Sequence, residues 1–263
     1  MVEFHQIAAA LYLAAGIGAL LGVVLGKSGM ERGASIGLAL GALFQATGFA
    51  TLHRLPSSPP VTDLPMAISF TVWIGVLFLL ALMWRFRIPA LTGTIGPVAF
   101  LAVFIACMRL SAPVEETVGA SGSLPHLHVL LGSAGLGLLG VAGVAGAFFL
   151  AEHARLKAKR GVAGKGLLPS LEALDRVNRV SLAIGFPLLT LGLLTGVLWL
   201  RAAQGVSWQG NGHEIFTVAA WGIYAGLAGA RFVGHQGARQ AAASAVAGFV
   251  FLLFAVVGVG VLA

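Results

Sequence analysis

The chain has 263 residues, of which 58% are hydrophobic and only 10% are charged. A soluble domain of this length does not need so much apolar surface, so the composition excludes a water-soluble fold and predicts a polytopic membrane protein. The formal net charge is +7, but the basic residues fall in short loops between apolar runs, so we expect no nucleic-acid partner. The one cysteine, Cys107, lies within an apolar run, so we expect no disulfide, CxxC redox pair or thiolate metal cluster.

Eight apolar runs follow one another, each close to the ~20 residues that a helix needs to cross a bilayer. They cover approximately residues 4–26, 34–53, 64–84, 88–109, 127–152, 180–200, 214–233 and 241–262. The predicted fold class is therefore all-α, a polytopic bundle of eight transmembrane helices in a single transmembrane domain over residues 1–263. The 37 glycines and many alanines allow such helices to approach closely through small-residue faces.

The basic residues are distributed unevenly between alternate loops. Thirteen of the 16 Lys and Arg residues lie in the first, third, fifth and seventh loops, and the other side has only Arg54, Arg109 and Arg201. Positive charge beside a membrane span stays in the cytoplasm. We therefore predict that both termini lie outside, in a multi-pass protein of the bacterial inner (cytoplasmic) membrane.

The loops show no sign of a soluble domain. Residues 55–65 and 111–125 are rich in Pro, Ser and Gly, which is typical of connections. The longest inner loop contains PSLEALDRVNRV at 169–180, where Ser170 is a candidate helix cap. Leu174 and Val177 then share one stripe with Leu171. This pattern predicts a short helix lying at the cytoplasmic interface.

Histidines gather at the predicted outer ends of the spans. Those of the first, second, fifth and seventh spans are His5, His53, His126, His128 and His213. His153 and His235 fall among basic loop residues, where we expect them to be solvated. Neutral imidazole is a common ligand of haem iron and divalent metals. A histidine at a helix end can equally be an ordinary interfacial residue, so position alone leaves both interpretations open.

The other candidate residues also allow two interpretations. Glu214 is a candidate metal ligand, or a candidate carboxylate that hydrogen-bonds to a metal-binding histidine. Alternatively, its negative charge only interacts favourably with the helix dipole in the first helical turn. The aromatic residues Trp199, Trp208, Trp221 and Tyr224 can line a porphyrin pocket or form an interfacial belt. With no phosphate loop, Ser/His/Asp order or paired carboxylates in a span, we expect no enzyme. We disfavour a transporter because no span is expected to bury a charge.

From about residue 124 to the end, the chain resembles the cytochrome c assembly protein family, the haem-handling group that includes CcsA, ResC and CcmC. The matching segments are LHVLLGSAGLGLLGVAGVAGAFFLAEHARLK, LPSLEALDRVNRVSLAIGFPLLTLGLLTGVLWL, AAWGIYAGLAGAR and the weakly similar AAASAVAGFVFLLFAVVGVG. The most specific part is IGFPLLTLGLLTG. The first half matches only in hydropathy and number of spans.

One departure from the family is informative. Members that deliver haem for cytochrome c ligation carry a Trp-rich outer loop that ends in a WDPKE-like stretch. Here the corresponding segment is GVSWQGNGHEIFTVAAW, with Trp208 as a lone remnant and Glu214 where the Glu would fall. The family's later outer histidine has no counterpart after Arg239. The chain is thus more similar to the HemX-like and YpjD-like branch, and full cytochrome c synthase activity is not expected.

The resemblance implies a haem site at the outer face. His128 matches the family's outer histidine and would be one axial ligand of haem b; His213 would be the second. His53 and His5 are the next candidates for an axial ligand, and Trp208 would stack near the haem. The implied function is assistance to c-type cytochrome biogenesis, in which haem is carried transiently, with other assembly proteins of the membrane as partners. The alternative is a HemX-like regulator of a haem-synthesis enzyme, with no stable haem.

Overall fold

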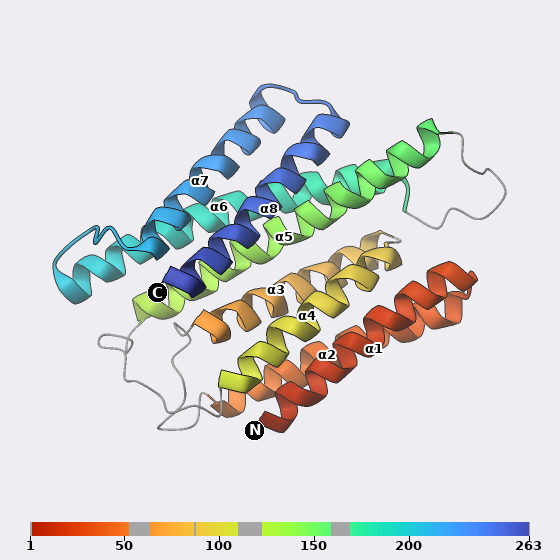
Figure 1. Cartoon of the computed structure of the whole chain (residues 1–263), viewed down its shortest axis with the longest axis horizontal. Coiled ribbons are helices and arrows are strands. Elements are labelled where there is room, and N and C mark those ends of the chain that lie inside the picture. The colour runs from red at the N-terminus through yellow and green to blue at the C-terminus, as the bar shows by residue number, and fades with distance from the viewer. Residues whose placement is uncertain (1, 53–63, 87, 110–122, 159–168, 263) are drawn as a thin grey trace. The chain divides into compact units, whose positions relative to one another are not determined.

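The computed structural model describes residues 2–52, 64–86, 88–109, 123–158 and 169–262. Within these ranges every regular element is a helix (Figure 1). The helices are α1 (Val2–Leu25), α2 (Ser28–Leu52), α3 (Leu64–Arg85), α4 (Pro89–Arg109), α5 (Ser123–Lys157), α6 (Leu171–Gln204), α7 (Gly212–Ala228), the π-helix η1 (Gly229–Val233) and α8 (Ala238–Leu262).

Eight of these helices, counted over the described part of the chain, are long and apolar enough to cross a membrane. The prediction of an all-α, eight-span membrane protein is thereby confirmed. The chain forms two compact units, one of Met1–Thr117 with Ala154–Ala173 and one of Val118–His153 with Leu174–Ala263. The single transmembrane domain and the outside position of both termini stay predictions.

In the first unit, α1 packs against α2 and α4, and α3 packs against α4 and α2. Glycines bring α1 and α4 into backbone contact. A Cβ atom added at Gly16 would lie 2.5 Å from the Cδ atom of Pro97, and one added at Gly96 would lie 2.7 Å from the carbonyl oxygen of Tyr12. Since no larger residue fits at either glycine, small residues set this contact, as they do in membrane bundles.

Buried polar side chains hold α1, α2 and α3 in register. The Tyr12 hydroxyl donates to Oε1 of Gln45 at 2.7 Å, and Nε2 of Gln45 donates to the carbonyl oxygen and the Oγ atom of Ser69 at 3.1 and 2.9 Å. All three residues are fully buried. Because each side chain has a direct partner, this network specifies how the three helices pack.

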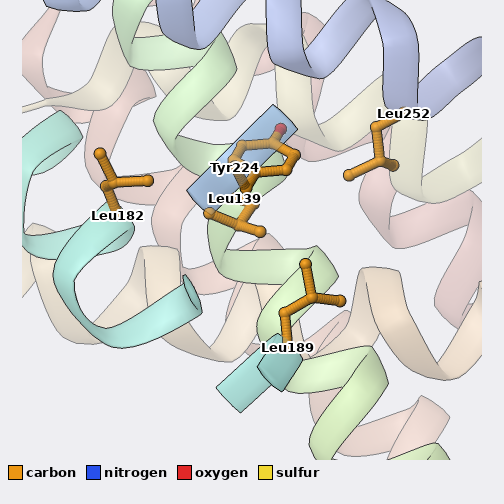
Figure 2. Packing of buried hydrophobic residues seen from close by; sticks show 5 residues of the cluster. All are labelled: Leu139, Leu182, Leu189, Tyr224 and Leu252. Carbon is orange, nitrogen blue, oxygen red and sulfur yellow. The ribbon is translucent and has the colours of Figure 1, made fainter. Parts of the chain in front are cut away.

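In the second unit, α5 and α6 cross at glycines. A Cβ atom added at Gly135 would lie 2.6 Å from the amide nitrogen of Leu189, and one added at Gly192 would lie 2.7 Å from the amide nitrogen of Gly132. These contacts explain the small residues of IGFPLLTLGLLTG. Around the crossing lies an apolar core that α7 and α8 complete, formed by Leu139, Leu182, Leu189, Tyr224 and Leu252 (Figure 2).

The prediction of a separate short helix at residues 169–180 is wrong, because this segment is the first part of the continuous 34-residue helix α6. Its start was predicted correctly: Oγ of Ser170 accepts a hydrogen bond from the amide of Ala173 at 3.2 Å. Leu174 and Val177 are fully buried. The apolar stripe therefore packs inside the protein, and no glycine or proline interrupts the helix before it enters the span.

The expectation that no span buries a charge is also wrong. Arg231, in η1 at the end of the seventh span, is buried. Its Nη2 atom lies 2.5 Å from Oδ1 of Asp175, and its Nη1 atom donates to the carbonyl oxygen of Gln236 at 3.0 Å. The carboxylate comes from α6, far away in the sequence. A span tolerates a buried cation when such a partner is close.

Candidate functional site

His128 lies near the start of α5 and its ring contacts α6. Its Nδ1 atom is 2.9 Å from the carbonyl oxygen of Gly192, and its ring centre is 5.9 Å from that of Trp199. A carbonyl oxygen only accepts hydrogen bonds, so Nδ1 must carry the proton. Nε2 of the neutral imidazole then keeps its lone pair. A histidine that binds a metal through Nε2 has this tautomer, with Nδ1 donating to a fixed partner.

Glycines of α6 make room for the His128 ring. A Cβ atom added at Gly196 would lie 2.8 Å from Nδ1 and 2.9 Å from Cε1 of His128. Gly192, Gly196 and Trp199 are spaced by four and three residues, so they share one face of the helix. The backbone contact between Gly192 and Gly132 brings that face close enough for the imidazole to reach a main-chain carbonyl. The same glycines that pack the helices therefore position the histidine.

His213 lies in the first turn of α7, and the structure brings it next to His128. Their ring centres are 6.4 Å apart and the ring planes meet at 85°. A bond from a metal to an imidazole nitrogen is about 2 Å long, so two imidazoles on opposite sides of one metal have centres about 6 Å apart. The observed spacing falls in this range. His213 is exposed and His128 is half-buried, so the pair opens to the surface of its unit.

The donor set of this pair suits haem better than a bare metal ion. Among the described residues, no group of three or more His, Cys, Asp or Glu side chains is arranged to hold a metal. A bare zinc ion needs three or four protein ligands. Haem iron takes only its axial ligands from the protein, because the macrocycle supplies the others. Two neighbouring imidazoles therefore match the number of protein ligands that haem iron takes.

Glu214 orders the loop that leads to His213. Its Oε2 atom accepts hydrogen bonds from the amides of Gln209 and Gly210, both at 2.8 Å. Oδ1 of Asn211, the N-cap residue of α7, accepts from the amide of Glu214 at 2.9 Å. The arrangement differs from a capping box in that the carboxylate accepts from the two residues before the N-cap and not from the N-cap amide itself. Of the roles considered for Glu214, the structure thus supports the one at the helix start, where its carboxylate fixes the loop.

Replacing Glu214 by alanine is expected to loosen this loop. The amides of Gln209 and Gly210 lose a charged acceptor, and about 1.4 kcal/mol of lost hydrogen bonding corresponds to about tenfold faster exchange. Hydrogen–deuterium exchange of the purified protein measures this directly. Glu214→Gln is the matched control, because it keeps an acceptor oxygen and should exchange at a rate closer to that of the wild type. Unchanged exchange in the alanine variant would show that the carboxylate does not hold the loop.

The structure separates the four aromatic candidates. Trp199 alone has its ring packed against His128. Trp208 is exposed in the loop after α6, where its Nε1 atom lies near Gly210. Trp221 donates from Nε1 to Oγ1 of Thr190 at 3.0 Å, and Tyr224 belongs to the core of the second unit. The last two therefore serve packing.

The other candidate histidines occupy different surroundings. His5 belongs to the first unit and is fully buried. Its ring meets that of Phe49 edge-on at 5.2 Å, and a Cβ atom added at Gly48 would lie 2.3 Å from its Cε1 atom. It is thus enclosed by α1 and α2. His53 lies outside the described residues. His126 is exposed on α5.

Gly192 and Gly196 were not predicted as parts of the site, and Trp199 was predicted only as one of four aromatic residues that could line a porphyrin pocket. The spacing of Gly192, Gly196 and Trp199 along one helical face was visible in the sequence. It became informative only with knowledge of which face of α6 meets His128, because small residues spaced in this way occur throughout the chain.

Comparison with known proteins gives a consistent result. The family model described as Cytochrome C assembly protein matches residues 61–263. The match includes α3 and α4, so it extends further toward the N-terminus than the resemblance from residue 124. Two similar relatives are named Cytochrome c biogenesis protein CcsA. The one from Prochlorococcus marinus subsp. pastoris is 27% identical over 227 residues, covering 77% of this chain and 72% of the relative. That from Prochlorococcus marinus strain MIT 9303 is 25% identical over 232 residues, covering 77% and 73%.

Proposed function

The chain belongs to the cytochrome c assembly protein family, and on that premise we propose that it handles haem for the biogenesis of c-type cytochromes. The family and the CcsA relatives support a multi-pass membrane protein of this process. The finer proposal is that haem b binds between His128 and His213 at the outer face of the bacterial inner membrane. One observation carries it: two histidines from different helices lie 6.4 Å apart, centre to centre, and one is fixed in the ligating tautomer.

Each residue of the site has a definite part in this proposal. A bound haem would supply an iron and an aromatic macrocycle. His128, oriented by its contact of 2.9 Å with the Gly192 carbonyl oxygen, and His213 would hold the iron through their imidazole nitrogens. Trp199 would offer an aromatic surface beside His128. The one cysteine of the chain, Cys107, belongs to the first unit and not to this site, and His213 is exposed. This suits a haem that is passed on and not kept.

The short segment between α6 and α7 supports a role with partners. Residues 205–211 take the place of the family's Trp-rich loop and have one tryptophan, Trp208. We propose that another membrane protein of cytochrome c assembly supplies the haem-presenting surface that this loop lacks. The same departure underlies our placement of the chain near the HemX-like and YpjD-like branch and our expectation that it is not a complete synthase.

A deletion strain tests the function. We expect the strain to lose covalently bound cytochrome c, measured by haem staining of denaturing gels, and to regain it with the wild-type gene. Complementation with Gly226→Ala should also succeed, because a Cβ atom at this helical glycine meets nothing within 4 Å, whereas His128→Ala should fail. Normal cytochrome c with altered tetrapyrrole levels would contradict the assembly role and favour the alternative of a regulator of haem synthesis.

A further inference from the structure

The second unit contains a small cavity away from the histidine pair. It lies among α5, α6, α7, η1 and α8, and its polar lining comes from Tyr224, Arg231, Gln236 and Ser244. The volume that the centre of a water-sized sphere can occupy in this cavity is about 10 Å³. This is room for a single water, since a cavity must offer at least about 10 Å³ by this measure to hold one.

Two of the residues that line this cavity each have a buried polar atom without a protein partner. Neither Oη of Tyr224 nor Oε1 of Gln236 has a hydrogen-bond partner among the described residues. Tyr224 is 1% exposed and sits within an apolar core, as Figure 2 shows. An unpaired buried hydroxyl or amide oxygen costs free energy, and the hydrocarbon layer offers no bulk water to satisfy it.

The remaining polar groups of the cavity are already engaged. The Arg231 guanidinium contacts Oδ1 of Asp175 at 2.5 Å and the carbonyl oxygen of Gln236 at 3.0 Å. The Gln236 side chain donates from Nε2 to Oγ of Ser244 at 3.2 Å. Asp175 pairs with Arg231 through Oδ1 and with the more exposed Arg179 through Oδ2, so the buried guanidinium already has a carboxylate partner. The cavity therefore fits a small neutral ligand that can both donate and accept hydrogen bonds.

We propose that this cavity binds one water molecule, which hydrogen-bonds to both Oη of Tyr224 and Oε1 of Gln236. The water ties α7 to the segment that follows η1. At this point the amide of Gly234 donates to the carbonyl oxygen of Gly229 at 3.0 Å, a π-type bond that widens the helix. Water is a common occupant where a helix departs from regular geometry. The site is independent of the proposed haem binding.

Tyr224→Phe tests the proposal through the sign of its effect. If the hydroxyl binds a water, its removal takes away one of the two groups that hold this water, and the hydrogen bond of the water to Gln236 weakens. The thermal midpoint of unfolding in mild detergent should then fall by about 3 °C. Tyr12→Phe is the reference, because that hydroxyl has a direct protein partner, Gln45. If the cavity is dry, Tyr224→Phe removes an unpaired polar group, so an unchanged or higher midpoint overturns the proposal.

A double variant separates the water from loss of packing. In a Gln236→Leu background the bridge is already broken, so we expect Tyr224→Phe to lower the midpoint by less than half as much as in the wild type. An equal loss in both backgrounds overturns the proposal, because the hydroxyl then acts without Gln236. A structure at a resolution that shows ordered waters should have density within hydrogen-bonding distance of both oxygens in the wild type and none in Tyr224→Phe.

Discussion

Replacing His128 by alanine is expected to weaken haem binding by the purified protein at least about 100-fold. Loss of a residue that merely supports a metal ligand costs 10- to 100-fold in affinity, so loss of the ligand itself should cost at least the upper value. His128 is the better-fixed member of the pair, because the Gly192 carbonyl oxygen holds its Nδ1 atom at 2.9 Å. The absorption spectra of the oxidised and reduced protein, titrated with haem, measure the effect.

Two histidine variants complete the experiment. His213→Ala should also weaken the haem band and shift it, since one axial ligand remains. His126→Ala is the matched control: it lies two residues before His128 on the same helix and is exposed, so its spectrum should equal that of the wild type. A wild-type protein that stays colourless after haem is added would contradict the haem-carrier proposal. The same holds if His128→Ala binds haem normally.

Hydropathy and charge predicted the helices well, because a helix that crosses a bilayer needs a minimum length of apolar residues, and this length can be read directly from the sequence. They did not fix how each helix is rotated or which neighbour it meets. His5 and His128 illustrate the difference. Both lie near the start of a predicted span, yet the structure encloses His5 between α1 and α2 and places His128 beside His213.

Contacts between distant residues were the least predictable. The ion pair of Arg231 with Asp175 joins residues 56 positions apart, and each looked like an ordinary charge of a cytoplasmic loop. The continuity of α6 was missed for a related reason, because charged residues at its start suggested an interface while their apolar neighbours are buried in the protein. The proximity of His128 and His213 agrees with the pair chosen from the resemblance. That they bind haem stays a prediction.

Gly196→Ala is expected to weaken haem binding by about 10- to 100-fold while leaving the fold intact, since it disturbs the support of a ligand. The new methyl group would lie 2.8 Å from Nδ1 of His128, which is too close for van der Waals contact. A side chain can rotate away, so the imidazole should leave the Gly192 carbonyl oxygen and lose its fixed orientation. Haem titration of the purified variant measures the loss, and its thermal midpoint should stay near that of the wild type.

Two other glycines make this result specific. Gly192→Ala would place its methyl group 2.7 Å from the backbone nitrogen of Gly132, so α5 and α6 must separate and the thermal midpoint should fall. At Gly226 a Cβ atom meets nothing within 4 Å, and alanine there should preserve haem binding and raise stability slightly. Normal haem affinity in Gly196→Ala would mean that His128 is not held where the ligand role requires it. A drop in its midpoint equal to that of Gly192→Ala would assign Gly196 to helix packing instead.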